Sequence, residues 1–471
     1  MLIHEKDNVL VDPSTGQKTA RFDIKSGERV IKYGYPIGVA TTDIKAGEPV
    51  HIHNLRSAIS GVGAWEFRPE KAVGSLSAAE AGLPEFFCGY LRADGSVGIR
   101  NELWIIPTVG CANCTAKVLA QKCGGKALTH QFGCSQLGDD LAMTRRILCG
   151  LARNPNAGGV LILGLGCEEN TLESMRAELG ESERIKYLNL QDCGDEIAEG
   201  MRQIDELRRG MAGDKREKFP VSKLRIGVKC GGSDGYSGIT ANPLVGRTME
   251  IFAASGATLL MTEIPEVFGA EEILLSHCQS RGAFDETASM ISAFRKYYID
   301  HGEGISDNPS PGNIAGGIST LEEKSLGCVQ KGGQVEVLGG LACGENVGER
   351  CKSAGQGGGL WMVIGPGNDL IDVTILAASG AVLILFTTGR GTPLCAPVPT
   401  LKLSTNSRLA EKKAHWIDFD AGRLLSAPEC DAASLTKELY RLCTDMCSGE
   451  ETVGERNGYY DVALWKNGVT L

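Results

Sequence analysis

The chain has 471 residues, of which 23 % are charged, and its formal net charge is −10. This length fits several folded domains, and the negative charge argues against a nucleic acid or an anionic membrane as partner, because neither would gain counterion release. No signal-like opening and no run of about 18 apolar residues is visible, so we expect neither secretion nor a transmembrane helix. The odd number of cysteines, 17, predicts reduced thiols in the cytoplasm rather than a disulfide framework.

Residues 1–60 predict a small β-rich module. Apolar and polar residues alternate there between turn signals at Gly27, Tyr33-Gly34 and residues 43–47. From residue 61 to 84 the alternation gives way to scattered Gly, Ser, Pro and Ala. We interpret residues 61–84 as a linker that crosses the surface of another domain.

Residues 85–221 and 222–471 predict two α/β domains. In the first, the strand-like runs ELWIIPTV and GGVLILGLG alternate with helical stretches such as GDDLAMTRRILCGLAR and GDEIAEGMRQIDELRRGMAGDKREK. In the second, LRIGVKCGG, GATLLMTE, LWMVIGPG and GAVLILFTTGRG are strand-like, and two helical segments share the ending AASGA before a strand. Such alternation predicts mainly parallel sheets covered by helices. The expected fold class is therefore α/β, with a small β module at the N-terminus.

Five cysteines each follow an apolar, strand-like run and a glycine-rich turn: Cys111, Cys134, Cys167, Cys230 and Cys328. Open α/β sheets build their ligand sites at the carboxyl edge, and a thiol there is a soft metal ligand or an acid-base group. A single cysteine near a core edge is often only a small buried residue. Five in similar surroundings favour an enzyme.

His51 and His53 flank one residue of a predicted strand, so we expect their imidazoles on the same face. Such a pair commonly supplies two metal ligands or catalytic groups, and His4 is a candidate third ligand. The alternative is a pair of exposed polar residues on the outer face of a small barrel.

Two glycine-rich segments carry groups that suit a polyhydroxylated anion. Their candidate substrate-binding residues are Ser233, Ser237, Thr240, Asn242, Thr387, Thr388 and Arg390. Arg390 is suited to a bidentate grip on a carboxylate. Glu263, after the strand-like GATLLMTE, and Asp234, within CGGSDGYSGITAN, are candidate catalytic acids or bases.

Nine long segments together carry a resemblance to a known family: GYPIGVATTDIKAGEPVHIHNLRS, GIRNELWIIPTVGC, HQFGCSQLGDD, NPNAGGVLILGLGCEEN, CGGSDGYSGITANPLVGR, LMTEIPEVFGAE, NPSPGNIAGGISTLEEKSLGC, PGNDLIDVTILAASGA and LFTTGRGTP. They resemble the altronate/galactarate dehydratase family of bacterial sugar-acid dehydratases. The resemblance implies that residues 1–60 form the β-clip known as an SAF domain. It also implies a need for Fe(II) or another divalent cation, with Mn, Mg and Ca as further candidates.

The implied reaction is dehydration of a sugar acid such as D-altronate to 2-dehydro-3-deoxy-D-gluconate, by removal of the C2 proton and loss of the C3 hydroxyl. The implied partner is this small molecule, and a homodimer is left open. Galactarate or another aldarate is an alternative substrate, and elimination of sulfite from a sulfolactate-type acid is an alternative reaction. A sugar-acid-binding protein without turnover is the alternative outside enzymology.

Two metal sites are left open. One is a mononuclear ion held by His4, His51 and His53 at the joint between the small module and the larger body. The other is an iron–sulfur cluster on Cys111, Cys134 and Cys167, whose positions after strand-like runs predict one common sheet edge. Three thiolates with one open iron would also suit a dehydratase.

Overall fold

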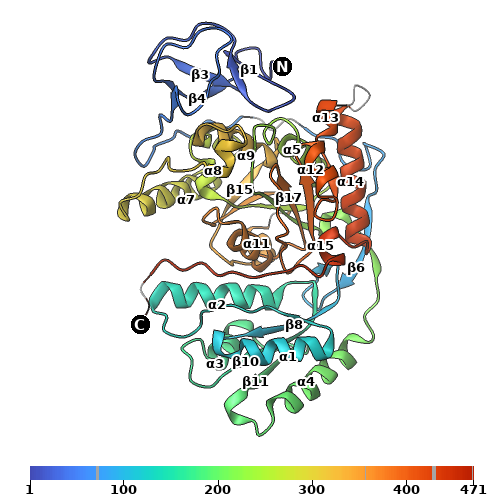
Figure 1. Cartoon of the computed structure of the whole chain (residues 1–471). Helices are drawn as coiled ribbons and strands as arrows, with labels where there is room; N and C mark the ends of the chain where they lie inside the picture. The colour runs from blue at the N-terminus through green and yellow to red at the C-terminus, as the bar shows by residue number, and fades with distance from the viewer. Residues whose placement is uncertain (71–73, 356, 427–430, 469, 471) are drawn as a thin grey trace.

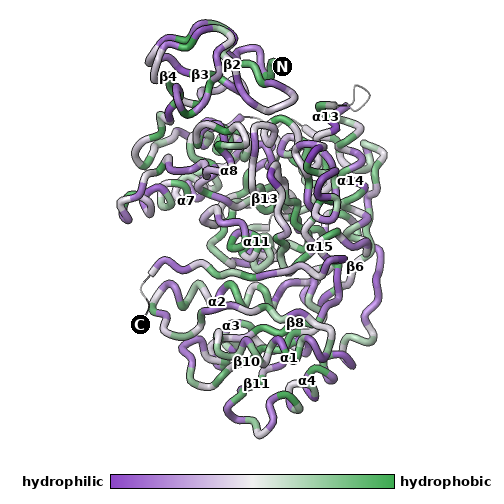
Figure 2. The backbone as a smooth tube through the Cα atoms, in the orientation of Figure 1, coloured by the Kyte–Doolittle hydropathy of each residue, from purple (hydrophilic) through white to green (hydrophobic). Residues whose placement is uncertain are grey.

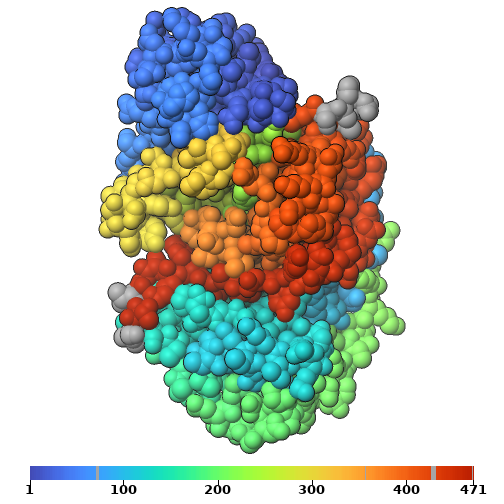
Figure 3. Space-filling view, viewed as in Figure 1, coloured from blue at the N-terminus to red at the C-terminus, as the bar shows by residue number. Residues whose placement is uncertain are grey.

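The computed structural model describes residues 1–70, 74–355, 357–426, 431–468 and 470. Three bodies are stacked along the molecule (Figure 1). A small strand module lies at the top, a large α/β body in the middle and a second α/β body at the bottom, and the space-filling view shows them in direct contact (Figure 3). No helix among the described residues has the length and apolar character needed to cross a membrane.

The N-terminal module contains two small antiparallel sheets. Its strands are β1 (Val9–Val11), β2 (Lys18–Ala20), β3 (Arg29–Lys32), β4 (Tyr35–Ala40) and β5 (Leu55–Arg56), paired as β1-β2 and β3-β4-β5. The predicted turn between β3 and β4 is present, with Tyr33 and Gly34 both at positive φ (61° and 80°). Positive φ at both central residues gives the turn the twist that a tight hairpin needs.

The expectation that His51 and His53 lie in a strand is wrong. Residues 51–54 form a turn, because the Asn54 side chain accepts a hydrogen bond from the His51 backbone N–H (3.0 Å) and donates one to the Pro49 carbonyl (2.9 Å). Side chain-to-backbone bonds of this kind compete with strand pairing.

The predicted linker crosses the surface of the large body in its described parts. The Glu70 N–H donates to the Ser276 carbonyl (2.8 Å), and the Ala78 N–H donates to the Ser255 hydroxyl (2.8 Å). Residues 71–73 of the predicted linker lie outside the described residues.

The lower body, the central domain, has a four-stranded parallel sheet of order β11-β10-β8-β9. Its strands are β8 (Glu102–Pro107), β9 (Lys126–Ala127), β10 (Ala157–Gly164) and β11 (Ile185–Asn189), and its helices are α1 (Asn113–Cys123), α2 (Gly138–Arg153), α3 (Leu172–Leu179) and α4 (Glu196–Met211). A small antiparallel sheet of β6 (Phe86–Leu91), β7 (Val97–Gly98) and β12 (Glu217–Pro220) lies beside it. The strand β10 is buried along its whole length, as expected for a sheet covered on both faces.

The middle body, the C-terminal domain, has a seven-stranded parallel sheet of order β15-β16-β14-β13-β17-β18-β19. The strands are β13 (Arg225–Cys230), β14 (Thr258–Met261), β15 (Val337–Leu341), β16 (Gly359–Val363), β17 (Leu383–Thr388), β18 (Thr400–Ser404) and β19 (Phe419–Asp420). The helices are α5 (Ala241–Ala254), α6 (Glu271–Ser276), α7 (Arg281–Asp300), α8 (Pro311–Ala315), α9 (Leu321–Cys328), α10 (Val347–Ala354), α11 (Asp369–Ala378), α12 (Ser407–Lys412), α13 (Arg423–Ser426), α14 (Ala432–Ser448) and α15 (Val453–Arg456). Figure 2 shows that the hydrophobic segments are concentrated in the sheets and in the helices that cover them.

The α/β fold class with a small N-terminal strand module and mainly parallel sheets is confirmed. Three of the five singled-out cysteines follow or end strands, namely Cys111, Cys167 and Cys230. The other two do not. Cys134 lies in a loop, and Cys328 ends the helix α9, which the Thr320 side chain caps by accepting the Glu323 N–H. The short KSLGC run is helical because this cap starts a helix ahead of it.

The two α/β bodies are tied together by buried contacts. The Asn154 side chain donates to the carbonyls of Ala377 (2.8 Å) and Ala381 (2.9 Å), which lie at and after the end of α11. The C-terminal segment, residues 459–468, passes between α2 and α11 (Figure 1). Its Ala463 N–H donates to Thr374 of α11, and its Asn467 N–H donates to Asp140 of α2.

Candidate functional site

The carboxyl edge of the seven-stranded sheet has a topological switch point between β13 and β17. From β13 the chain continues to β14 on one side, and from β17 it continues to β18 on the other. The loops after the two strands are joined, since the Gly231 N–H donates to the Thr387 carbonyl (3.0 Å) and the Arg390 N–H to the Gly232 carbonyl (2.9 Å). Open α/β sheets place ligands at such a point.

Next to the switch point lies a group of charged and thiol side chains that we name the buried ion cluster: Lys229, Cys230, Glu263, Glu266, Cys328 and Lys331. They come from the end of β13, the segment after β14, the end of α9 and the turn that follows it. All six are buried. The ligand atoms of the two cysteines and two glutamates lie within 4.8 Å of one another, close enough to hold a metal ion.

The ammonium group of Lys331 lies among these ligand atoms. Its Nζ is 2.9 Å from Cys230 Sγ, 2.8 Å from Cys328 Sγ and 2.8 Å from Glu263 Oε2. The position therefore attracts a cation, and in this structure the cation is an ammonium group. Thiolates and carboxylates also suit Fe(II), so the donor set fits a divalent ion in its chemistry.

The pKa values of two buried carboxyl groups, one in the cluster and one at its edge, are shifted in opposite directions. Burial would raise the pKa of Glu263, but the ammonium groups of Lys229 and Lys331 outweigh it and lower the pKa to about 2. Glu263 also has φ of 71°, an uncommon backbone conformation for a non-glycine residue that is frequent at functional sites. Burial raises the pKa of Asp372, at the edge of the cluster, to about 8 although Lys229 lies 3.3 Å away.

The helix α9 joins the cluster to the N-terminal module. Glu323 pairs with Lys18 (2.9 Å) and Lys32 (2.8 Å) of the module, and all three side chains are buried. The next residue, Lys324, pairs with Glu266 of the cluster at 2.8 Å. The module is thus docked on the carboxyl edge of the sheet. A small cavity at this joint is lined from both sides, by Lys32 and Asp234 among others.

Most of the predicted substrate-binding hydroxyls lie at this edge and are already hydrogen-bonded to other groups of the protein. The Thr387 hydroxyl donates to Asn242 (2.6 Å), and the Thr240 hydroxyl donates to the Thr405 carbonyl (2.7 Å). The Thr388 hydroxyl accepts the Gly391 N–H at 2.9 Å.

The carboxylate of Asp234 already accepts hydrogen bonds from neighbouring residues. It accepts the Thr405 hydroxyl at 2.9 Å, the Tyr236 N–H at 3.1 Å and the Asn406 amide at 3.1 Å, while the Ser237 hydroxyl lies 3.2 Å away. Burial raises its pKa. The carboxylate is therefore an anchor of the loops, and an assignment as acid or base stays a prediction.

Two predicted binding residues remain available to a ligand. Arg390 is exposed at the switch point, and no side-chain partner is found for it among the described residues. Ser233 is buried beside Asp234 and uses only its backbone carbonyl, which accepts from Asn313 at 2.8 Å.

The three predicted histidine ligands are not gathered into one group among the described residues. His51 is half-buried at the joint, where its Nε2 lies 3.1 Å from the Ile314 carbonyl, and His53 is exposed two residues on. Burial, followed by the charge of Lys18, lowers the pKa of His51, and His53 is close enough to add to the shift. His4 contacts instead the β3–β4 turn, against Gly34.

The three cysteines of the iron–sulfur alternative lie on loops that bond to one another. The loop of Cys111 meets that of Cys134 through the Gly110 N–H and the Phe132 carbonyl (2.9 Å). The loop of Cys134 meets that of Cys167 through the Asn170 N–H and the Gly133 carbonyl (3.0 Å). We name this region of the central domain the three-cysteine edge. All three thiols are exposed. Among the described residues, none of them belongs to a group of three or more possible metal ligands whose ligand atoms lie within 4.8 Å of one another.

Sequence reasoning did not identify Lys229 and Lys331 as site residues. The sequence predicts Cys230 and Cys328 as possible metal ligands or acid-base groups and Glu263 as a catalytic acid or base, but it does not bring the three together. The available signal was a lysine inside the otherwise apolar strand LRIGVKCGG, because a buried lysine requires an anionic partner. The described cysteines are all free, and Cys430 lies outside the described residues.

Comparison with known proteins gives matches along the whole chain. The model of the altronate/galactarate dehydratase SAF domain matches residues 9–58, that of the second domain of D-galactarate dehydratase/altronate hydrolase matches 89–212, and that of the D-galactarate/altronate dehydratase C-terminal domain matches 221–470. Altronate dehydratase of Escherichia coli is 44 % identical over 98 % of this chain and 93 % of its own length. Altronate dehydratase of Bacillus subtilis is 42 % identical over 100 % and 99 %. The L-threo-forming galactarate dehydratase of Escherichia coli is 30 % identical over 93 % and 86 %.

Proposed function

Because the chain belongs to the altronate/galactarate dehydratase family, we propose that this hydro-lyase converts D-altronate to 2-dehydro-3-deoxy-D-gluconate and water. The observation that carries the proposal is the near-complete coverage of two relatives named altronate dehydratase, at 44 % and 42 % identity. Galactarate is less well supported as the substrate, because the relative named galactarate dehydratase is 30 % identical to this chain.

We place the reaction at the joint between the N-terminal module and the carboxyl edge of the seven-stranded sheet. Arg390 is exposed there, so its guanidinium is free to bind the substrate carboxylate through two hydrogen bonds. Gly316, two residues after the carbonyl that His51 contacts, and Gly389, next to Arg390, both lie against Asp234. Asp234 therefore fixes the loops of the two groups relative to each other.

His51 is the base that we assign to the C2 proton. Its lowered pKa leaves the imidazole neutral at pH 7, which is the state that accepts a proton. Glu263, with a pKa of about 2, is too weak a base, and the hydrogen bonds of Asp234 are already used. Asp372, with a pKa of about 8, holds a proton at neutral pH, which is the state required of an acid that assists the leaving hydroxyl.

We assign the metal to Cys230, Glu263, Glu266 and Cys328 of the buried ion cluster, with Fe(II) as the ion. Three of these ligand atoms already surround the ammonium group of Lys331, and the fourth, from Glu266, lies within 4.8 Å of them. A divalent ion there would supply positive charge that stabilises the enolate and polarises the leaving hydroxyl. Asp369, which pairs with Lys229 at 3.0 Å and has a side chain 35 % exposed, connects the cluster to the surface.

The three-cysteine edge is the second candidate for iron. The observation in its favour is that three exposed thiols lie on loops bonded to one another. Exposed thiols are reachable by a substrate, and three thiolates leave one iron of a cluster open.

The test of function is an assay of anaerobically Fe(II)-loaded protein against a panel of aldonates and aldarates, read as keto-deoxy acid formed. Turnover of altronate above all others is expected, and no product from any sugar acid would contradict the proposal. Arg390→Ala should raise KM and lower kcat together, and His51→Ala should lower kcat. Product only from galactarate, or sulfite released from sulfolactate, would move the protein to the corresponding alternative.

The test of the metal site uses matched cysteine variants. Cys328→Ser should lose bound iron while Cys134→Ser keeps it, in a colourless protein that contains no acid-labile sulfide. The reverse result, with visible absorption and sulfide that disappear in Cys134→Ser, would assign the iron to the three-cysteine edge. The cytoplasmic location and the homodimer stay predictions of the sequence.

A further inference from the structure

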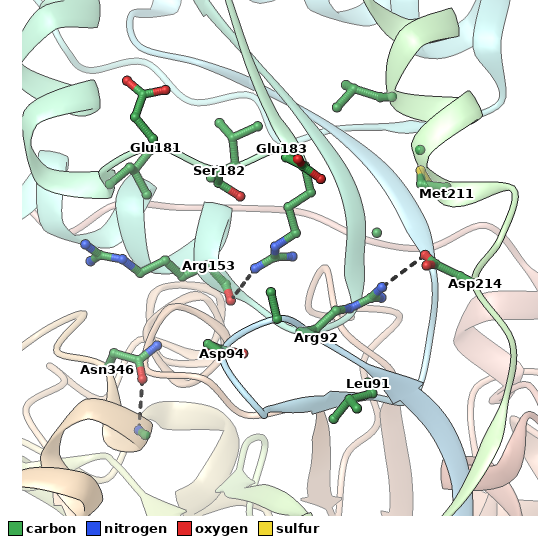
Figure 4. A pocket seen from close by; sticks show the side chains of 18 of the residues that line it. Leu91, Arg92, Asp94, Arg153, Glu181, Ser182, Glu183, Met211, Asp214 and Asn346 are labelled. Atoms are coloured by element: carbon green, nitrogen blue, oxygen red, sulfur yellow. Dashed lines mark hydrogen bonds and ion pairs between the residues drawn. The ribbon is translucent and has the colours of Figure 1, made fainter.

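A cavity of about 640 Å³ lies between the central and C-terminal domains, on the side of the molecule where β10, β11 and β13 begin. Both candidate metal sites lie at the other ends of these sheets, beyond the carboxyl ends of the strands. The close-up shows Arg92, Arg153, Asp94 and Asn346 around the open space, with Glu181 and Glu183 on one side of it (Figure 4). Nothing in the proposed reaction uses this cavity.

Of the five cationic side chains that line the cavity, two form ion pairs within the described part of the chain. Arg92 pairs with Asp214 at 3.3 Å, and Arg153 lies 3.9 Å from Glu349. No ion pair within the described part of the chain includes Arg184 or Arg225. Arg184 donates to backbone carbonyls alone, among them that of Arg153 at 3.0 Å.

Arg225, the first residue of β13, has no hydrogen bond from its side chain to any described residue although it is half-buried. Its guanidinium lies on two glycines. A Cβ on Gly348 would stand 2.2 Å from its Nη2, and one on Gly380 would stand 3.3 Å from its Nη1. The absence of side chains at both positions makes room for a guanidinium that then has five donors and no acceptor.

The cavity is also lined by five carboxylates, so the formal charges of the lining balance, but none of these carboxylates bonds directly to Arg184 or Arg225 within the described part of the chain. Asp94 already accepts the backbone N–H and the hydroxyl of Ser96, at 3.0 Å and 2.6 Å. Glu181 and Glu183 are exposed. Burial lowers the pKa of both Arg184 and Arg225, and the charge of Asp94 opposes this shift in both without accepting a hydrogen bond from either guanidinium. Such cations are costly to bury unless an anion accompanies them.

We propose that this cavity binds a small oxyanion, a phosphate or carboxylate group, between Arg184 and Arg225. Planar guanidinium groups match both kinds of oxyanion through paired N–H donors. Arg184 precedes β11 of the central domain and Arg225 begins β13 of the C-terminal domain. A bound anion therefore links the two domains at a site remote from the proposed reaction.

The test is titration calorimetry of the full-length protein with inorganic phosphate and, separately, with succinate, at constant ionic strength. We expect saturable binding of at least one of the two anions, at one site per chain. Arg225→Met should weaken it at least about tenfold, which corresponds to about 1.4 kcal/mol. Gly348→Ala should weaken it similarly, because the added methyl group displaces the guanidinium while keeping its charge.

The matched control is Arg350→Met, which removes an arginine of the same helix as Gly348 that pairs with Glu286 instead. Binding should be unchanged in this variant and in Arg390→Met, which removes the cation assigned to the substrate. If only phosphate binds, the cavity is a phosphate site, and if only succinate binds, it is a carboxylate site. Absence of saturable binding of both anions by the wild-type chain, or wild-type affinity in both Arg225→Met and Gly348→Ala, would overturn the proposal.

Discussion

At the scale of single residues, the site is governed by how buried charges neutralise one another. Lys331 shows this most clearly, because its ammonium group contacts two thiols and a carboxylate within 2.9 Å. A buried cation so well surrounded is both a stabilising ion and a competitor for any metal ion that uses the same ligands.

Lys331→Met should therefore have two effects. Loss of the ammonium group leaves Glu263 with one cation fewer, which should lower the free energy of unfolding by about 3–5 kcal/mol. The same change frees the cationic position, so the variant should retain more Fe(II) or Co(II) than the wild type. Chemical denaturation and metal analysis after gel filtration measure the two effects. Lys412→Met, at an exposed lysine, is the control, and unchanged metal retention would argue against the buried ion cluster as the metal site.

The raised pKa of Asp372 predicts that the stability of the folded chain depends on pH with a definite sign. Its pKa is about 8 in the folded chain and 3.8 ordinarily, so between these values the folded state holds a proton that the unfolded state has lost. This contribution to stability is therefore present at low pH and is lost as pH rises from about 4 to about 8, by at most about 1.4 kcal/mol per pH unit.

Asp372→Asn stays neutral at every pH and should flatten this part of the stability profile, with a gain over the wild type at pH 8. Urea unfolding between pH 5 and pH 8.5 provides the measurement. Asp445→Asn, at an exposed position, should leave the slope unchanged, and an equal slope in Asp372→Asn and wild type would show that the carboxyl group is already ionised when folded.

At the scale of elements, α9 is the shared wall between the N-terminal module and the buried ion cluster. Consecutive residues of the helix face in different directions, so Glu323 pairs with the module while Lys324 pairs with Glu266. We therefore expect a substitution on the side of α9 that faces the N-terminal module to affect the buried ion cluster on its other side.

Glu323→Gln should loosen the module. The substitution leaves Lys18 and Lys32 buried with no carboxylate between them, which costs about 3–5 kcal/mol. Their charges lower the pKa of Glu323 to about 2 against its burial, so its contribution is present above about pH 4.5 and is lost as pH falls toward 2.

Limited proteolysis within residues 1–60 and thermal unfolding at pH 7 measure the effect of Glu323→Gln. Glu5→Gln, at an exposed residue of the same module, is the control. A module as resistant to protease in Glu323→Gln as in the wild type would mean that other contacts hold it in place.

At the scale of the whole molecule, the central and C-terminal domains are joined by buried hydrogen bonds, so they should unfold together. Asn154→Ala removes two donors and leaves the carbonyls of Ala377 and Ala381 without them. A loss of about 1–3 kcal/mol is expected, seen in scanning calorimetry as a lower or divided transition. Asn457→Ala, which removes a hydrogen bond of an exposed residue, serves as the control. A single transition at the wild-type temperature would show that the domains do not depend on this contact.

The sequence by itself determined the kinds of elements and their order. Segments such as GGVLILGLG and GDDLAMTRRILCGLAR form the expected strand and helix because hydrophobic periodicity acts over neighbouring residues. The AASGA endings after α5 and α11 each lead into a strand, as expected. Local pattern failed where side chains compete with the backbone, as at the turn of His51 and Asn54, and where a cap starts a helix, as at Thr320 ahead of Cys328.

Only the tertiary structure decided which functional groups meet. Cys230 lies 33 residues from Glu263, 98 from Cys328 and 101 from Lys331, yet their side chains are in contact. These contacts depend on β13 pairing with β14 and on α9 packing over their ends, and strand order is not encoded in any local periodicity. The guanidinium of Arg225, which has no hydrogen-bond partner in the part of the chain that the structure describes, is a second case, because its surroundings come from Gly348 and Gly380, more than a hundred residues away along the chain.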